Sequence, residues 1–291
     1  MPLPRPVGFV LGGGGSLGAI QVGMLQALFE HDIAPDLVAG TSVGSINGAV
    51  LARDPTAAAN RLSHAWARTT RTQVFPGGLL AQARNLRQTK THLFPSTGLA
   101  TMIADFLGPA AGFADLVLPF AAITMDIATA APHPITAGPL LPALLASAAI
   151  PGVYPPVEHD GRLLYDGGVV ANVPLRQALA MGARSLVVLD CTFPGRLPEP
   201  PATLAEALLF TAIIAMRSQA ALEAPLVAAE VPVVYLPGPA LHRVSPLDFD
   251  HTDALIAEAY EAARTFLASL RVGGPGLYGS PTGNTPPATD G

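Results

Sequence analysis

The sequence GTSVG at residues 40–44 stands between a short apolar run, residues 37–39, and a helical pattern, residues 46–53. A G-x-S-x-G sequence between a strand and a helix is the setting of a nucleophile elbow, a tight turn that presents a serine hydroxyl. Gly40 and Gly44 flank the serine and allow the strand and the helix to pass closely. The segment therefore predicts Ser42 as a nucleophile, although the same five-residue pattern also occurs in turns that only cap a helix.

A second strand, glycine turn and helix precede this segment. Residues 7–11 are apolar, residues 12–15 are four glycines, and apolar residues then recur at helical spacing. The run also matches the G-x-G-x-x-G of dinucleotide sites through Gly13, Gly15 and Gly18. Such a site needs an acidic residue at the end of the next strand, where this chain has the serine segment instead. Backbone N–H groups at a helix start suit a developing oxyanion, which is the interpretation that we favour.

A carboxylate follows a third apolar run. Asp166-Gly167-Gly168 comes directly after residues 163–165, so the acid stands at the expected end of a strand and before a sharp turn. Asp-Gly is also one of the strongest turn signals, and alone it would predict nothing more than a turn.

Four segments in this order resemble the patatin-like phospholipases: residues 12–25, 40–49, 147–157 (SAAIPGVYPPV) and 166–175 (DGGVVANVPL). The resemblance implies a lipid acyl hydrolase of the phospholipase, lysophospholipase or esterase type, with no metal and no organic cofactor. It implies a Ser–Asp dyad of Ser42 and Asp166. It also implies an oxyanion hole and a set of motif glycines, namely Gly13, Gly14 and Gly15 for the hole and Gly18, Gly40, Gly44, Gly167 and Gly168 for the motifs.

One position departs from the family pattern. Many members carry arginine or lysine beside the glycine run, at the position where this chain has Leu17. Without that cation, stabilisation of an oxyanion or a phosphate must come from backbone donors, so the headgroup preference does not follow from the resemblance.

Apolar runs and helical patterns alternate along the chain, which predicts an α/β fold with a mostly parallel sheet sandwiched by helices. We expect one catalytic domain over residues 1–272, with its motif-bearing core at about 7–191, and a flexible Gly/Pro-rich tail over 273–291. Further strands are expected at 120–125, 163–165, 186–191 and 231–236, and further helices at 175–181, 204–219 and 253–270.

Three other functions compete with this interpretation. An α/β-hydrolase triad would place its histidine after the acid, at His242 or His251, but that fold needs several strands before its elbow and only 41 residues precede Ser42. An acyltransferase would use the same serine and oxyanion hole. A non-enzymatic ligand-binding domain would leave the elbow, the glycine run and Asp-Gly-Gly as three coincidences.

The composition of the chain disfavours some classes of binding partner and of cellular location. The net charge is −5 and the pI is about 5.7, which disfavours nucleic acid. Cys191 is the single cysteine and is expected to be a buried thiol. We expect neither a signal peptide nor a membrane-spanning helix, and a cytoplasmic or peripheral membrane location.

A basic segment at residues 61–94 is the candidate for peripheral membrane contact. No Asp or Glu occurs between Pro55 and Ala104, whereas six basic residues do. Aromatic and aliphatic residues are interleaved with them, as on surfaces that meet anionic headgroups, and as on helices that bury one apolar face. The two groups are Arg61, Arg68, Arg71, Arg84, Arg87 and Lys90, and Trp66, Phe75, Leu79, Leu80 and Phe94.

Overall fold

The computed structural model describes residues 3–108, 112–191, 204–239 and 246–281. Within them a nine-stranded sheet runs in the order β5-β6-β3-β2-β1-β7-β8-β9, and β4 pairs with β3. The neighbouring strands β3, β2, β1, β7, β8 and β9 are parallel to one another. Strands β4, β5 and β6 add antiparallel pairings at the β3 side of the sheet. The strands are β1 (Val7–Leu11), β2 (Leu37–Thr41), β3 (Phe120–Asp126), β4 (Ala131–Ile135), β5 (Val157–His159), β6 (Arg162–Asp166), β7 (Ser185–Leu189), β8 (Pro232–Tyr235) and β9 (Gly276–Tyr278).

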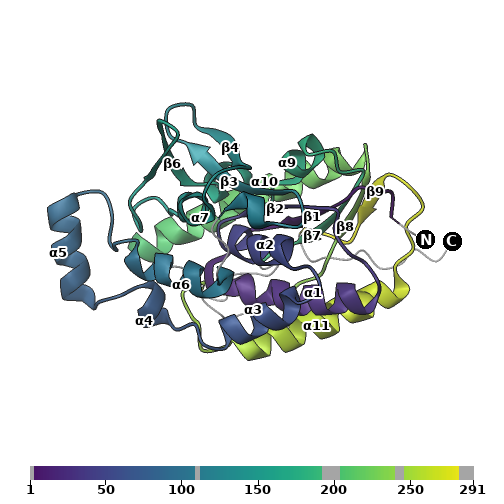
Figure 1. Ribbon diagram of the computed structural model, residues 1–291, viewed down its shortest axis with the longest axis horizontal. Helices are drawn as coiled ribbons and strands as arrows, with labels where there is room; N and C mark the ends of the chain where they lie inside the picture. Colours follow the sequence, from purple (N-terminus) through teal and green to yellow (C-terminus); the bar gives the residue numbers. More distant parts are fainter. Residues whose placement is uncertain (1–2, 109–111, 192–203, 240–245, 282–291) are drawn as a thin grey trace.

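Helices cover both faces of this sheet (Figure 1). One layer holds α1, α2, α3, α7 and α11, and the opposite layer holds α8, α9 and α10, while α5 projects away from the body. The helices are α1 (Ala19–Glu30), α2 (Val43–Arg53), α3 (Ala58–Trp66), α4 (Arg71–Val74), α5 (Leu79–Thr89), α6 (Thr97–Leu107), α7 (Leu140–Ser147), α8 (Gly168–Ala171), α9 (Leu175–Ala180), α10 (Leu204–Ala228) and α11 (Thr252–Ser269), with 3₁₀ turns at η1 (Gly15–Gly18) and η2 (Phe113–Asp115).

The central strands are apolar throughout because both of their faces are buried. In β1, Phe9 and Leu11 pack into the core beneath α1 and α2, while Val10 packs into the core beneath α9 and α10. Side chains alternate between the faces of a strand, so a parallel strand covered on both sides reads as one continuous apolar run. This is why the sequence revealed β1, β2, β3 and β7 clearly.

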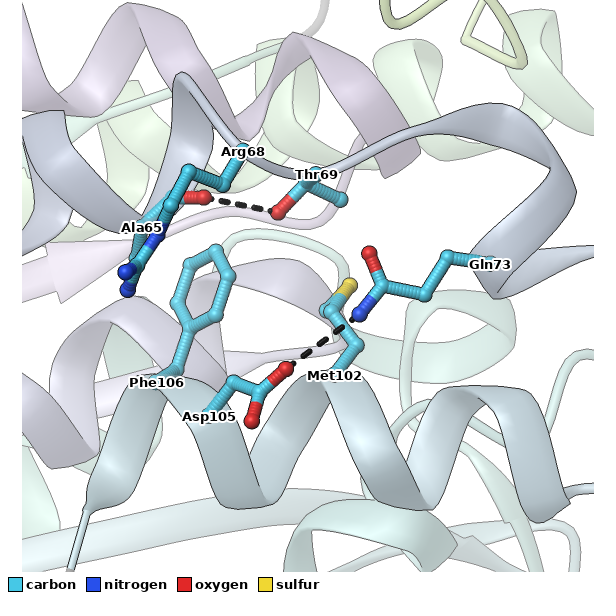
Figure 2. A pocket seen from close by; sticks show the side chains of 7 residues that line it. All are labelled: Ala65, Arg68, Thr69, Gln73, Met102, Asp105 and Phe106. Atoms are coloured by element: carbon cyan, nitrogen blue, oxygen red, sulfur yellow. Dashed lines mark hydrogen bonds between the residues drawn. The ribbon is translucent and has the colours of Figure 1, made fainter.

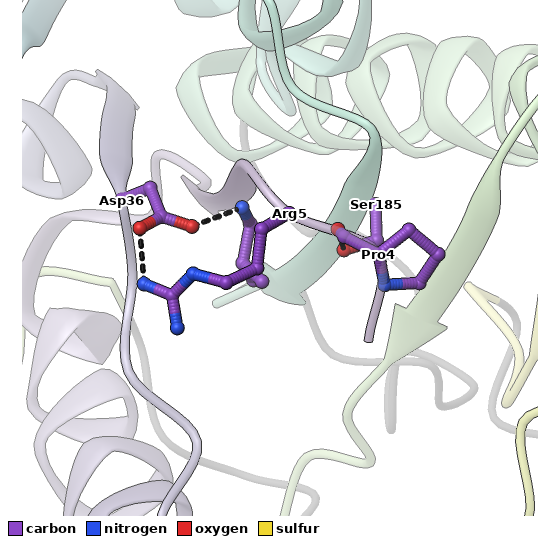
Figure 3. Close-up of polar contacts among 5 residues, drawn as sticks. Pro4, Arg5, Asp36 and Ser185 are labelled. Carbon is purple, nitrogen blue, oxygen red and sulfur yellow. Dashed lines mark hydrogen bonds and ion pairs between the residues drawn. The ribbon is translucent and has the colours of Figure 1, made fainter. Parts of the chain in front are cut away.

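The N-terminal segment contacts the starts of three strands, at the end of the sheet opposite the glycine run (Figure 3). Arg5 forms an ion pair with Asp36, and the other oxygen of that carboxylate accepts the Val7 N–H at 2.6 Å. The hydroxyl of Ser185 donates to the carbonyl of Pro4 at 2.7 Å. These contacts link the starts of β1, β2 and β7 and so fix the register that places the other ends of the strands together.

The α/β architecture and its mostly parallel sheet are confirmed, and two elements differ from expectation. The predicted helix at 204–219 continues to Ala228 and contains Pro225. The expectation of a tail from residue 273 is wrong for residues 276–278, which form β9 against β8 because Leu277 and Tyr278 pack on the core. Residues 282–291 lie outside the described residues. In the described part of the chain, no helix has both the length and the hydropathy needed to cross a membrane.

Candidate active site

Ser42 occupies a strained turn between β2 and α2. Its φ and ψ are 55° and −128°, a backbone conformation that costs about 1–3 kcal/mol for a residue with a side chain. A Cβ on Gly40 would lie 2.3 Å from the carbonyl oxygen of Gly44, and one on Gly44 would lie 2.2 Å from the oxygen of Leu11. The close crossing of strand and helix therefore requires both glycines, as the elbow prediction supposed.

Ser147 holds the elbow from beneath. The Ser42 N–H donates to the Ser147 hydroxyl oxygen at 3.0 Å, and that hydroxyl donates to the carbonyl of Ile123 on β3 at 2.7 Å. The Ser45 hydroxyl donates to the Ser42 carbonyl at 2.6 Å. Both polar backbone groups of the strained residue are thus satisfied in a buried setting, which stabilises the turn.

Asp166 lies at the end of β6 and is brought to Ser42 by the pairing of β6 with β3, the strand beside β2. Its carboxylate accepts the Gly168 N–H at 2.7 Å, and the Ser42 hydroxyl lies near enough to this carboxylate to lower its pKa. Its own N–H donates to the carbonyl of Ala149 at 3.0 Å. A Cβ on Gly167 would lie 2.4 Å from the Ile123 carbonyl oxygen, so the Asp-Gly-Gly turn presses against β3.

Burial dominates the electrostatics of this carboxyl. Only 4% of Asp166 is exposed, and desolvation raises its pKa to about 6, against the lowering effect of the hydrogen bonds from Gly168 and Ser42. A group with that pKa is ionised at neutral pH and remains basic enough to accept a proton in a reaction.

The glycine run lies directly against the serine. A Cβ on Gly13 would meet the Ser42 Cβ at 3.0 Å and the Asn172 side-chain oxygen at 2.6 Å. The Gly13 N–H donates to the Asn172 carbonyl at 3.2 Å, so this amide serves the fold. A Cβ on Gly14 would lie 2.5 Å from the Cβ of Cys191, and Gly15 has φ 61°, a conformation that favours glycine.

A buried polar network supports the run from the side of α1 and α2. The Gln21 side-chain amide donates to the carbonyls of Gly12 and Leu189 at 2.9 and 3.0 Å. Asn47 donates to the Gly18 carbonyl at 2.9 Å and to the Gln21 side-chain oxygen at 2.8 Å. Sequence reasoning missed these residues, and the signal for them was an amide side chain in a mostly apolar stretch of each helix.

An apolar cavity of about 40 Å³ opens beside Ser42. Its walls come from α2, α3, α4, α6 and the 148–154 segment, and they include Ile46, Trp66, Phe75, Met102 and Tyr154. The Tyr154 hydroxyl donates to the Val74 carbonyl at 2.8 Å, so this ring presents only apolar atoms to the cavity. Such a cavity suits a hydrocarbon chain attached to a group held at the serine.

Comparison with known proteins accords with this geometry. The family model described as Patatin-like phospholipase matches residues 9–179, more than half of the 291 residues. The chain belongs to the patatin-like phospholipase family. The match includes the glycine run, the elbow and the Asp-Gly-Gly turn.

Relatives of this patatin-like chain are much longer proteins. Patatin-like phospholipase domain-containing protein 7 of Mus musculus is 34% identical over 189 residues, which cover 63% of this chain and 13% of the mouse protein. Lysophospholipase NTE1 of Mycosarcoma maydis is 32% identical over 189 residues, with 63% and 10% covered. The crystal structure of VipD from Legionella pneumophila has a TM-score of 0.50 at 14% identity, covers 91% of this chain and 67% of VipD, and shows the shared fold.

His251, one of the two candidate histidines, has a partner of its own away from Ser42 and Asp166. The His251 side chain is 56% exposed and pairs with Asp248 at 2.9 Å, whereas the Asp166 carboxylate lies near enough to the Ser42 hydroxyl for that hydroxyl to lower its pKa. His242 lies outside the described residues. Leu17 is buried in the core, so its position supplies no charge to the glycine run.

The basic segment at 61–94 divides into a buried and an exposed part. Trp66, Phe75 and Phe94 belong to the hydrophobic core, so the expectation that they interleave with cations on a lipid-facing surface is wrong for these three. Trp66 and Phe75 line the cavity, and the Phe75 ring packs on the Phe94 ring with centroids 5.3 Å apart. The exposed part includes Arg61, Arg68 and Arg71 and most of α5, where Leu80 is 89% exposed.

Proposed function

We propose that the chain is a lipid acyl hydrolase that cleaves carboxylic esters through an acyl-enzyme on Ser42, with Asp166 as the base. The observation that carries this proposal is that the buried Asp166 carboxyl, whose pKa is raised to about 6 by burial, lies beside the Ser42 hydroxyl. The names of the longer relatives, a lysophospholipase and patatin-like phospholipases, support the substrate class.

In this mechanism Asp166 accepts the hydroxyl proton while the Ser42 Oγ attacks the ester carbonyl carbon. Negative charge develops on the carbonyl oxygen, and backbone donors in the 13–15 run stabilise it. Because the Gly13 N–H is engaged with Asn172, we assign the donor role to Gly14 and Gly15. The tetrahedral intermediate then collapses, and the leaving alkoxide takes the proton from Asp166.

Deacylation repeats these steps with water. Asp166 removes a proton from the water, whose oxygen attacks the acyl carbon, and the Ser42 oxygen leaves and recovers the proton as the fatty acid departs. The acyl chain occupies the apolar cavity during both halves of the reaction. No histidine takes part in this scheme.

Labelling with a fluorophosphonate probe and hydrolysis of acyl esters test the proposal. Ser42→Ala should abolish both, while Ser63→Ala, a serine on α3 that donates to the Ala59 carbonyl, should keep both. Mass spectrometry of the labelled peptide identifies the modified serine. Labelling at another serine, or full turnover by Ser42→Ala, would refute the assignment, and ester formation with added glycerol would reveal acyl transfer.

We further propose that α5 contacts anionic membranes. Leu80 and Leu86 on the projecting helix α5 are 89% and 43% exposed (Figure 1). Arg84 and Arg87 on this helix, and Lys90 directly after it, are exposed cations. Each basic residue near an anionic surface contributes about 1 kcal/mol of attraction, which salt screens.

Vesicle sedimentation tests the membrane contact. Substituting Arg84, Arg87 and Lys90 together with glutamine should weaken binding to phosphatidylserine-containing vesicles and leave hydrolysis of a soluble butyrate ester unchanged. A matched triple substitution of Arg176, Arg264 and Arg271, three exposed arginines on other elements, should leave binding nearly unchanged. Equal binding by all three proteins would refute a role for α5.

A further inference from the structure

Figure 2 shows the residues that line a second cavity, of about 20 Å³. This cavity lies beyond one wall of the apolar cavity beside Ser42, which we call the acyl cavity. Consecutive residues face the two spaces: Ala65 lines the second cavity and Trp66 the acyl cavity. The same holds for Gln73 and Val74. The two spaces therefore lie on opposite sides of a partition built from the end of α3, from α4 and from α6.

Met102 on α6 is the residue that lines both cavities. It is 4% exposed and fills the partition between them. Methionine is unbranched and has three rotatable bonds, so it changes shape with little strain.

The rest of the partition is held in place. The Trp66 ring nitrogen donates to the Asn47 side-chain oxygen at 3.2 Å. Its ring also packs edge-on against Phe106, with centroids 5.5 Å apart, and is stacked with Phe249 at 6.2 Å. Rotation of Met102 is therefore the least costly way to join the two cavities.

The second cavity has a mostly apolar interior, in which the buried Thr69 hydroxyl donates to the Ala65 carbonyl at 2.9 Å, and a polar mouth. Ala65, Met102 and Phe106 supply the apolar lining, while Arg68, Gln73 and Asp105 lie toward solvent, where Gln73 donates to Asp105 at 3.2 Å (Figure 2). An exposed hydrogen bond between two side chains opens at little cost, since water replaces it. A hydrocarbon chain that enters past Met102 thus has a path to the surface.

We propose that the second cavity is a subsite for the distal part of a long acyl chain and that Met102 is its gate, an inference that rests on the proposed hydrolase function. A space that admits a single water measures about 10–15 Å³, so the acyl cavity of about 40 Å³ accepts a short chain while Met102 is in place. Displacement of the thioether joins the two spaces and lengthens the path from Ser42. The ligand class is a fatty acyl chain, with its carboxyl carbon at Ser42.

The acyl-length profile of kcat/KM tests this inference with acetate, butyrate, octanoate and palmitate esters of p-nitrophenol. While the subsite is filling, each added methylene should raise kcat/KM about fourfold, and the rise should stop where space ends. Met102→Ala should move that stop to longer chains, and Met102→Leu should keep it near the native position. Ala65→Leu, which fills the second cavity, should lower palmitate turnover and leave butyrate turnover unchanged.

Two controls separate the gate from other causes. Met24→Ala removes a fully buried methionine on α1 that lines neither cavity, so it should lower the melting temperature and leave the acyl-length profile unchanged. In a Ser42→Ala background, a fluorescent palmitate analogue should bind more tightly when Met102 is alanine and more weakly when Ala65 is leucine. This binding measurement does not depend on catalysis.

The outcomes are distinguishable. Absence of all ester hydrolysis by the native chain would refute the proposed function, and the binding measurement would then decide the subsite alone. Normal butyrate hydrolysis with one common acyl-length profile for native, Met102→Ala and Ala65→Leu proteins would refute the gate. If Met102→Ala does not fold, Ala65→Leu carries the test.

Discussion

Replacement of Asp166 by asparagine is expected to stabilise the folded protein at neutral pH while it abolishes turnover. The carboxyl is 4% exposed, and its ordinary pKa of 3.8 is raised to about 6 by desolvation in the folded state. The buried ionised carboxylate therefore lowers the stability of the folded state, and a neutral amide at this position does not. Asparagine has the same shape, and its oxygen still accepts the Gly168 N–H.

The size of the effect follows from the two pKa values. The gap between 3.8 and about 6 corresponds to about 3 kcal/mol, which is the upper limit of the gain. Hydrogen bonds to a neutral amide are weaker than those to a carboxylate, so we expect a net gain of about 1–3 kcal/mol at pH 7. For a chain of this size, each kcal/mol raises the melting temperature by roughly 2 °C.

The sign of the pH dependence gives a second readout. Because the folded pKa is raised, the folded state binds the Asp166 proton more tightly, and native stability falls as pH rises from about 4 to about 6. The Asp166→Asn variant has no titrating carboxyl at this position, so its stability does not show this fall with pH. Its advantage in the free energy of unfolding by urea should therefore be near zero at about pH 4 and complete at about pH 7.

Asp54 provides a control of opposite sign. Hydrogen bonds from the Thr56 hydroxyl and the Ala57 N–H lower its pKa, so Asp54→Asn should destabilise the protein at neutral pH, with a difference that vanishes on acidification. Catalysis is followed in parallel with a butyrate ester. An Asp166→Asn protein that is less stable than native at neutral pH, or whose difference does not change with pH, would refute the desolvation argument. Retained turnover would refute the role of base.

Three further predictions concern the surroundings of the dyad. Gly14→Ala should lower kcat on the order of 10²-fold, because its Cβ would lie 2.5 Å from the Cβ of Cys191, and adding Cys191→Gly should recover much of the loss; no recovery would contradict displacement of the loop. Ser147→Ala should lower the free energy of unfolding by about 1–3 kcal/mol, measured in urea, since the Ser42 N–H loses its acceptor, and it should also lower kcat. His251→Ala should keep kcat/KM within a few-fold, whereas loss of a triad histidine costs several orders of magnitude; a folded but inactive variant would contradict the dyad.

The sequence was informative where one local pattern suffices. The elbow around Ser42 can be predicted from the sequence because a tight turn between strand and helix needs glycines at fixed positions. Buried parallel strands can be predicted because they appear as apolar runs. The contact between Ser42 and Asp166 is different in kind, since it depends on β6 pairing antiparallel to β3 across many intervening residues. That pairing leaves no local signal, and only the family resemblance predicted it.

Supporting residues were hidden for the same reason. Ser147 and Asn172 act through backbone groups of other segments, so their roles exist only once those segments meet. The aromatic residues of the basic segment misled because a Trp or Phe beside arginines has the same appearance whether it faces lipid or core. Residues 276–278 form a strand despite Gly276, because the side chains of Leu277 and Tyr278 pack on the core at this edge of the sheet.

The hydrogen bond from the Asp166 N–H to the Ala149 carbonyl has an evolutionary consequence. Ala148 and Ile150, the neighbours of that carbonyl, line the acyl cavity, so a mutation that reshapes this wall also shifts the base. A mutation in residues 148–150 is therefore expected to change substrate preference and turnover at the same time. For the proposed hydrolase, changes in acyl preference that preserve turnover are more accessible on the opposite wall, in α6, so α6 is the helix to compare among related chains.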